Sequence, residues 1–170
     1  WEAWALGPDW AGWGGGAALC GMVCGAGGGG PLADRVGRRK VVRCSMGLAS
    51  LGALMTAVAW GAPGLALARF VTGVGLGGAI PNIVALMNDL APTARRSSLT
   101  TIMLSFYSIG AMISALVAML IIPRYGWEAT FIIGGLPLLC LPSLARHWPE
   151  SLPYLREKDL AGARRLLPRI

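Results

Sequence analysis

The chain has 170 residues, of which 55% are hydrophobic and only 14% are charged. An ordinary soluble domain carries about 25% charged residues, so this sequence has too little charge to cover a water-exposed surface. Its mean hydropathy of +0.59 also excludes intrinsic disorder, which requires low hydrophobicity. The composition therefore indicates a chain whose solvent is mostly lipid.

Five uncharged stretches predict an all-α membrane protein, a bundle of several spans within residues 1–149. A helix needs roughly 20 apolar residues to cross the hydrocarbon core, and in lipid its backbone must satisfy its own hydrogen bonds. The predicted spans lie near 12–31, 41–60, 65–88, 99–122 and 128–146. In 150–170, charges alternate with leucines, which predicts a cytoplasmic amphipathic segment or a linker at the start of a central loop.

The basic residues favour one side of these spans. All but Arg69 and Arg124 of the 15 lie in the segments between the first two spans, after the third and beyond the fifth, or at the edges of the spans beside them, as Arg43 and Arg146 do. Because basic loops stay in the cytoplasm, we expect that side and the C-terminus inside and the N-terminus outside. The net charge of +7 then needs no nucleic-acid partner. Since the chain starts at Trp1 without a signal region, we expect a fragment that has lost a preceding span.

The sequence shows no recognisable catalytic centre. His147, the one histidine, has no zinc-type spacing from the four cysteines, which lie in apolar stretches. No nucleophile–base pair or phosphate loop is recognisable either. We therefore expect no enzyme activity and no metal or cofactor, and we interpret the cysteines as small buried hydrophobes.

A basic motif joins the first two spans. It reads Gly30-Pro-Leu32-Ala-Asp34-Arg35-Val-Gly37-Arg38-Arg39-Lys40. Its glycines permit a tight turn, and Asp34 either caps the next helix or pairs with an arginine. By composition alone, a simple basic loop facing the inner leaflet is an equal alternative.

The spacing of this motif resembles the signature G-x-L-x-D-R-x-G-R-R/K between the second and third helices of major facilitator transporters. The matching positions are Gly30, Leu32, Asp34, Arg35, Gly37, Arg38 and Arg39. In that family the aspartate and arginines form a conformational latch with the other half of the molecule. The resemblance implies this role for Asp34, Arg35 and Arg38, with the first helix and the C-terminal half as missing partners.

The third span begins with a second motif. It reads Arg69-Phe70-Val-Thr-Gly73-Val-Gly75-Leu-Gly77-Gly78-Ala-Ile-Pro81-Asn82. Three of its glycines match G-x-G-x-x-G, but inside an apolar helix without a preceding strand they make no dinucleotide site. Gly73 and Gly77 instead allow close helix packing, and Gly21 and Gly25 form a similar ladder in the first span.

Two polar residues of this motif are candidates for function. Arg69 either extends to the outer interface or takes part in proton coupling or anion contact. Its pattern resembles R-F-x-x-G-x-G-x-G in the fourth helix of the same family, which implies proton coupling. Asn82, after a proline, is either interhelical glue or a substrate contact.

A third run resembles one branch of the superfamily, the aromatic acid:proton symporters. That branch reads G-L-G-x-A-x-P-N, then an acidic residue, then P-x-x-R-R. Here Asp89 takes the acidic position, usually glutamate, and Pro92, Arg95 and Arg96 follow. Runs at 121–127, 134–138 and 149–153 are also similar, whereas the acidic signature of the branch's first helix is absent.

The resemblance implies a transporter in the bacterial inner membrane that carries aromatic or related organic acids with protons, driven by the proton gradient. Hydroxyls of the fourth span, including Ser105 and Tyr107, either bond to nearby backbone or line a central cavity with Arg69 and Asn82. A carrier for sugar or another metabolite and a non-transporting membrane interaction module remain alternatives. We do not expect this chain alone to transport, because a two-sided cavity needs both halves.

Overall fold

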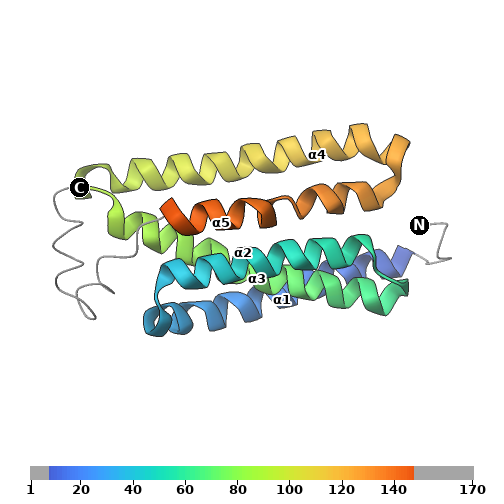
Figure 1. Cartoon of the computed structure of the whole chain (residues 1–170), viewed down its shortest axis with the longest axis horizontal. Coiled ribbons are helices and arrows are strands. Elements are labelled where there is room, and N and C mark those ends of the chain that lie inside the picture. Colours follow the sequence, from blue (N-terminus) through green and yellow to red (C-terminus); the bar gives the residue numbers. More distant parts are fainter. Residues whose placement is uncertain (1–7, 148–170) are drawn as a thin grey trace.

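The computed structural model describes residues 8–147, and within that range the chain forms helices and no strand. The elements are α1 (Pro8–Val36), α2 (Arg38–Ala57), α3 (Gly61–Leu90), the 3-10 helix η2 (Thr93–Arg95), α4 (Arg96–Gly134) and α5 (Pro137–His147). The long helices run back and forth along one axis (Figure 1). The segment 150–170, for which an amphipathic helix was predicted, lies outside the described residues.

Three changes of chain direction lie at glycines with positive φ, whereas the reversal between α3 and α4 runs through residues 91–95 and η2. Gly37 (φ 103°) separates α1 from α2, Gly61 (φ 77°) begins α3, and Gly126 (φ 81°) interrupts α4. Glycine adopts such angles without the steric penalty that a Cβ brings. The turn expected over residues 30–40 is therefore narrower than predicted, because α1 continues to Val36 and Gly37 alone makes the reversal.

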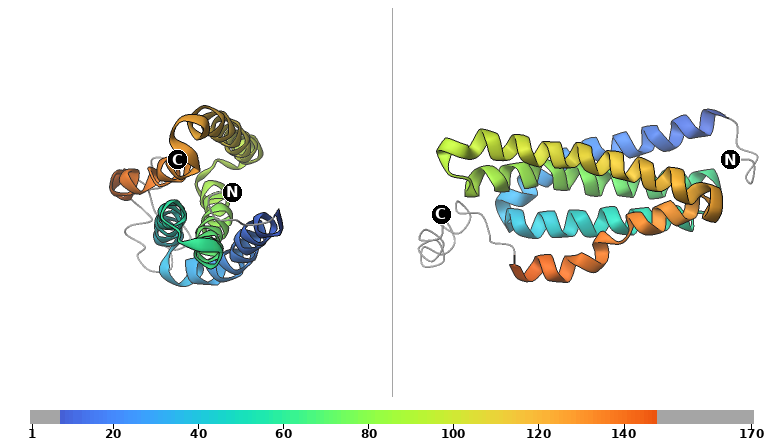
Figure 2. Two further views of the ribbon diagram at one scale, coloured as in Figure 1. Left: turned by 90° about the vertical axis from the view of Figure 1, so that its right-hand side faces the viewer. Right: turned by 90° about the horizontal axis from the view of Figure 1, so that it is seen from above.

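Helix α4 consists of two arms that fold back on each other at Gly126, where φ is 81° and ψ is 173°. Figure 2 shows the arm 127–134 returning beside the longer arm 96–125 and leading into α5. By length and hydropathy, two stretches of the described chain are able to cross a membrane, Gly61–Leu90 and Arg96–Ser143. The five-span arrangement stays a prediction.

The core forms where α3 packs against both α1 and α2. Most of its buried residues are small, and the largest fully buried side chains are Leu86, Val42 and Thr56. Small residues let the helix backbones approach closely, which supplies van der Waals contact where lipid offers no hydrophobic drive between helices.

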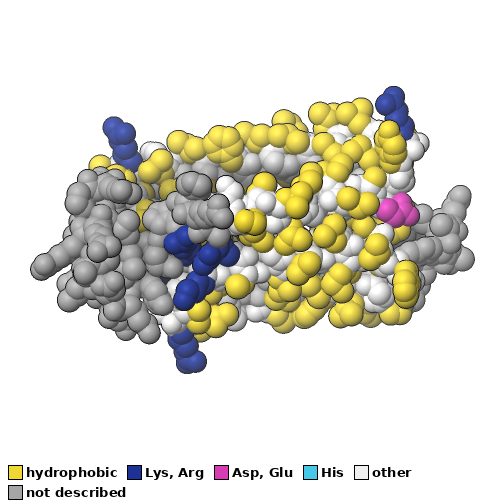
Figure 3. Space-filling view, in the orientation of Figure 1, with side chains coloured by type: hydrophobic (Ala, Val, Ile, Leu, Met, Phe, Trp, Pro, Cys, Tyr) yellow, Lys and Arg dark blue, Asp and Glu magenta, His cyan; other side chains and the backbone are white. Residues whose placement is uncertain are grey.

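The outer surface of the bundle is apolar. Helix α4 has no buried residue, and large side chains such as Phe106 (67% exposed) point away from the bundle. Figure 3 shows hydrophobic side chains along the visible face and basic ones toward its ends. Exposed apolar area on this scale indicates contact with lipid or further helices. The four cysteines, predicted to be buried, are free and exposed, because they lie on helix faces turned away from the core.

Candidate functional site

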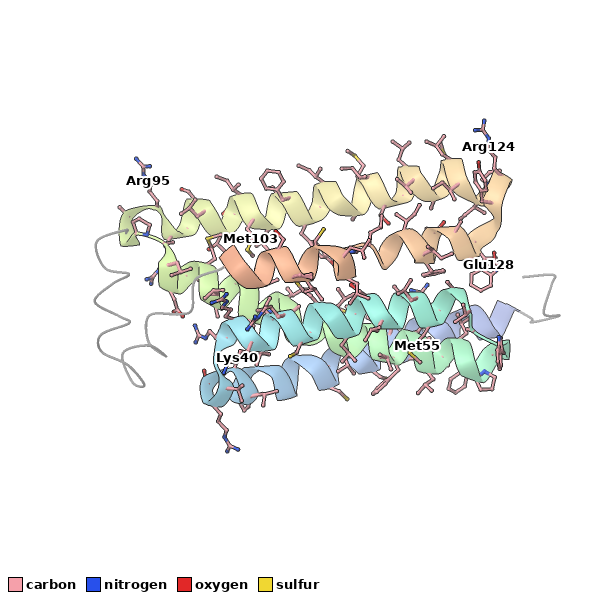
Figure 4. All side chains as sticks on the ribbon, viewed as in Figure 1. Lys40, Met55, Arg95, Met103, Arg124 and Glu128 are labelled. Atoms are coloured by element: carbon pink, nitrogen blue, oxygen red, sulfur yellow. The ribbon has the colours of Figure 1, made fainter. Side chains whose placement is uncertain are left out.

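The motif that contains Arg38 and Arg39 and the run that ends in Arg95 and Arg96 meet at one end of the bundle. Figure 4 shows Lys40 and Arg95 at this end, and Arg124 and Glu128 at the other. We call the first the basic end; it holds the reversal between α1 and α2 and the segment between α3 and α4. The structure therefore brings together two regions that lie more than fifty residues apart in sequence.

Arg38 links these regions. Its Nη1 donates a hydrogen bond to Oδ2 of Asp89 at the end of α3, and its Nη2 lies 3.8 Å from Oδ1 of Asp34. The side chains of Arg38 and Asp89 are only 26% and 18% exposed, whereas that of Asp34 is 73% exposed. The link to Asp89 is thus the partly desolvated one. Asp34 pairs with Arg38 and does not cap α2, whose N-cap Gly37 has no side-chain cap bond.

Both charges of the Arg38–Asp89 pair lie at unfavourable helix ends. Arg38 is the first residue of α2, where the helix dipole is positive, and Asp89 lies in the last turn of α3, where it is negative. Each side chain alone would destabilise its helix end, and the pair neutralises both. Such a placement is better suited to linking two helices than to stabilising either one.

The other residues of the first motif differ in exposure. Leu32 and Arg35 are exposed on α1, while Gly30 and Arg39 are half-buried and Gly37 is buried. The exposed members leave an apolar and a charged side chain available on the surface beside the Arg38–Asp89 pair.

The predicted glycine ladder is the contact between α1 and α3. A Cβ added at Gly21 or Gly25 would collide with the backbone of α3, and one added at Gly73 or Gly77 would collide with the backbone of α1. The two helices therefore touch backbone to backbone along this ladder. Gly75 of α3 faces α2 instead, since a Cβ added there would meet Ser45 and Ala49.

Asn82 lies inside this interface. It is 4% exposed and donates from Nδ2 to the carbonyl oxygen of Gly78 at 2.8 Å. A Cβ added at Gly29 of α1 would lie 3.2 Å from the same Nδ2. This geometry favours packing between helices over direct contact with a substrate.

The hydroxyls of Thr101, Ser105 and Ser108 in α4 bond to their own helix. Ser105 donates to the carbonyl oxygen of Thr101 at 3.0 Å, and Tyr107 is exposed. Within residues 8–147, no hydrogen bond or ion pair joins Ser105 or Tyr107 to Arg69. A link that the sequence did not predict ties α4 to α3: Thr100 Oγ1 donates to Oδ1 of Asn88 at 3.0 Å.

Arg69 rests on an aromatic ring. Its Cζ lies 4.6 Å from the centroid of Phe131 on the second arm of α4, a cation–π distance. Trp127 meets Phe131 edge to face, with centroids 6.0 Å apart and planes at 74°. Neither Phe131 nor Trp127 was predicted, although their spacing of four residues places them on one helix face. Arg69 and Asp89 lie toward opposite ends of α3, about 30 Å apart along its axis.

A cavity of about 490 Å³ lies at the end opposite the basic end, lined by Ala57, Val58, Ala59, Trp60, Gly61, Trp127 and Glu128. Tryptophans at a bundle end are typical of the membrane–water interface. Among the described residues, no group of three or more His, Cys, Asp or Glu side chains is arranged to hold a metal ion.

The family model of the Major Facilitator Superfamily matches residues 2–165. The chain belongs to this superfamily. It is 38% identical over 162 residues to the benzoate transport protein of Acinetobacter baylyi, covering 92% of this chain and 35% of that protein. It is 39% identical over 149 residues to the 4-hydroxybenzoate transporter PcaK of Pseudomonas aeruginosa, covering 87% of this chain and 33% of that protein. The chain thus spans about a third of these relatives.

The fold agrees with solved transporters of the superfamily. The partially occluded inward-open xylose transporter XylE of E. coli superposes with a TM-score of 0.79 at 21% identity, over 90% of this chain and 41% of that one. The predicted fold class, an all-α membrane bundle forming part of the amino-terminal half of a facilitator fold, is confirmed. Superfamily members are integral membrane transporters, not enzymes, and need no cofactor in general.

Proposed function

We propose that this chain is part of a proton-coupled symporter of aromatic or related organic acids in a bacterial inner membrane, with the basic end in the cytoplasm. Relatives that are 37–39% identical are named for benzoate, 4-hydroxybenzoate and gallate. Another at 38% is named for niacin. These compounds share a carboxylate on an aromatic ring, which supports that substrate class. The likeness to XylE rests on 21% identity and supports the fold only.

The observation that carries the proposal is the hydrogen bond between Arg38 and Asp89. It joins the motif that resembles the superfamily signature to the run that resembles this branch. In our proposal Arg38 holds the ends of α2 and α3 together, and the exposed Asp34 and Arg35 meet the other half of the transporter as a latch. Breaking the Arg38–Asp89 pair would leave each charge uncompensated at an unfavourable helix end, so the pair resists separation of the ends of α2 and α3.

For the substrate, Arg69 is the strongest candidate among the described residues. Its guanidinium has in-plane donors that match a carboxylate, and among residues 8–147 it contacts an aromatic ring and no carboxylate. In our proposal Arg69 serves anion contact and proton coupling, while Ser105 and Tyr107 supply polar lining from the exposed face of α4. Asn82 keeps α1 and α3 together.

Uptake by the complete reading frame that contains this chain tests the proposal. Vesicles from cells expressing it should accumulate labelled benzoate or 4-hydroxybenzoate when an inward proton gradient is imposed, and a protonophore should abolish accumulation. Xylose serves as the sugar control. Accumulation of xylose alone would favour the metabolite carrier, and membrane-inserted protein that moves none of these compounds would favour an interaction module.

A further inference from the structure

Arg69 is a half-buried cation toward the end of α3 opposite Asp89, and no carboxylate among residues 8–147 pairs with it. Arg38 makes ion pairs with Asp34 and Asp89 near the other end of α3. The Cζ atom of Arg69 lies over the ring of Phe131, 4.6 Å from its centroid. Phe131 lies on a different helical arm from Arg69, so this contact spans the space between α3 and the second arm of α4.

A ring in this position restrains the guanidinium without consuming its donors. The guanidinium is planar and carries five N–H donors in its plane. An aromatic ring attracts it through the π face and leaves the in-plane edge available. A long side chain fixed in this way loses less conformational freedom when a carboxylate binds to that edge. Trp127 packs edge-on against Phe131 on the same helix face.

We infer that Phe131 is a positioning residue that holds the Arg69 guanidinium by one face, so that its in-plane edge is presented to the carboxylate of an aromatic acid. The inference deepens the proposed function and rests on it for the substrate. The position of Arg69 itself can be measured without any transport.

Chemical labelling measures that position. Phenylglyoxal modifies arginine guanidinium groups, and mass spectrometry of the Arg69 peptide gives its labelling rate in the purified chain. Phe131→Leu should raise this rate about threefold or more, because leucine cannot hold the guanidinium face, whereas Phe131→Tyr should leave it unchanged. Phe106→Leu is the matched control, since Phe106 is an exposed phenylalanine of α4. The exposed Arg124 provides the internal reference.

Uptake kinetics in the complete reading frame measure the consequence for the substrate. Phe131→Leu should raise the KM for benzoate about three- to tenfold, with the maximal rate within about twofold. At 1.4 kcal/mol per tenfold, this is about 0.7–1.4 kcal/mol, within the range of a cation–π contact. Phe131→Tyr and Phe106→Leu should keep the KM of the parent.

Three results would overturn the inference: unchanged labelling of Arg69 in Phe131→Leu, increased labelling with an unchanged KM, or equal impairment by leucine and tyrosine. The last of these would mean that Phe131 only fills space. If labelling rises as expected but the parent protein takes up no aromatic acid, the proposed substrate is wrong, and Phe131 still holds Arg69.

Discussion

Replacing Gly25 with alanine should loosen the contact between α1 and α3. A methyl group there would lie 2.9 Å from the nitrogen of Gly78 and from the carbonyl carbon of Val74, and closer still to the oxygen of Val74. Ordinary contact of a Cβ begins at 3.4 Å. Because all three atoms belong to the backbone of α3, no side chain is able to rotate away, and the helices must separate.

The size of the effect follows from two opposing terms. Overpacking a close contact costs about 1–3 kcal/mol, while alanine gains about 1 kcal/mol over glycine in helix propensity. Gly28→Ala on the same helix receives only the gain, since nothing lies within 4 Å of its added Cβ. The free energy of unfolding of Gly25→Ala should therefore fall below that of Gly28→Ala by about 1–3 kcal/mol.

Thermal unfolding of the chain in mild detergent, followed by circular dichroism, measures this difference. For a chain of this length, 1 kcal/mol corresponds to about 2–4 °C in Tm, so the two variants should differ by roughly 6 °C at the middle of the range. Helicity before heating must be equal in both variants. Equal Tm values would refute the conclusion that α1 and α3 touch backbone to backbone at Gly25.

Three further predictions concern the basic end, its reversal and α4. Arg38→Gln should lower the free energy of unfolding by about 1–3 kcal/mol, because it leaves Asp89 unpaired. The double variant Arg38→Asp, Asp89→Arg should restore the free energy of unfolding, because each charge then suits its helix end. A double variant as unstable as Arg38→Gln would contradict the pairing. Gly37→Ala should lower the free energy of unfolding by about 1–3 kcal/mol, because alanine is strained at φ 103°. A Tm equal to that of the parent would show that residue 37 does not adopt this backbone conformation. Ser105→Ala should change stability by less than about 0.5 kcal/mol, because its hydroxyl bonds only to its own helix; a larger loss in the same melts would reveal a partner on another helix.

Several features follow from the sequence because they depend on local chemistry. Low charge and high hydropathy indicate a lipid-facing chain, and a chain in lipid must satisfy its backbone hydrogen bonds within helices. The ladder of Gly21, Gly25, Gly73 and Gly77 predicts close helix contact, since spacing by four residues places glycines on one helix face. The spacing of the basic motif was specific enough to indicate the superfamily. Each of these patterns lies within one short stretch of sequence, so it is visible without a structure.

The partners of the functional side chains were decided by tertiary structure. Arg38 bonds to Asp89, 51 residues away, and Arg69 on α3 contacts Phe131 on the second arm of α4. Helical periodicity predicts which residues share a helix face, but it does not predict how each helix is rotated about its own axis or which neighbouring helix that face contacts. For this reason the sequence left Asn82 open between packing and substrate contact, and its burial against α1 was seen only in the assembled bundle.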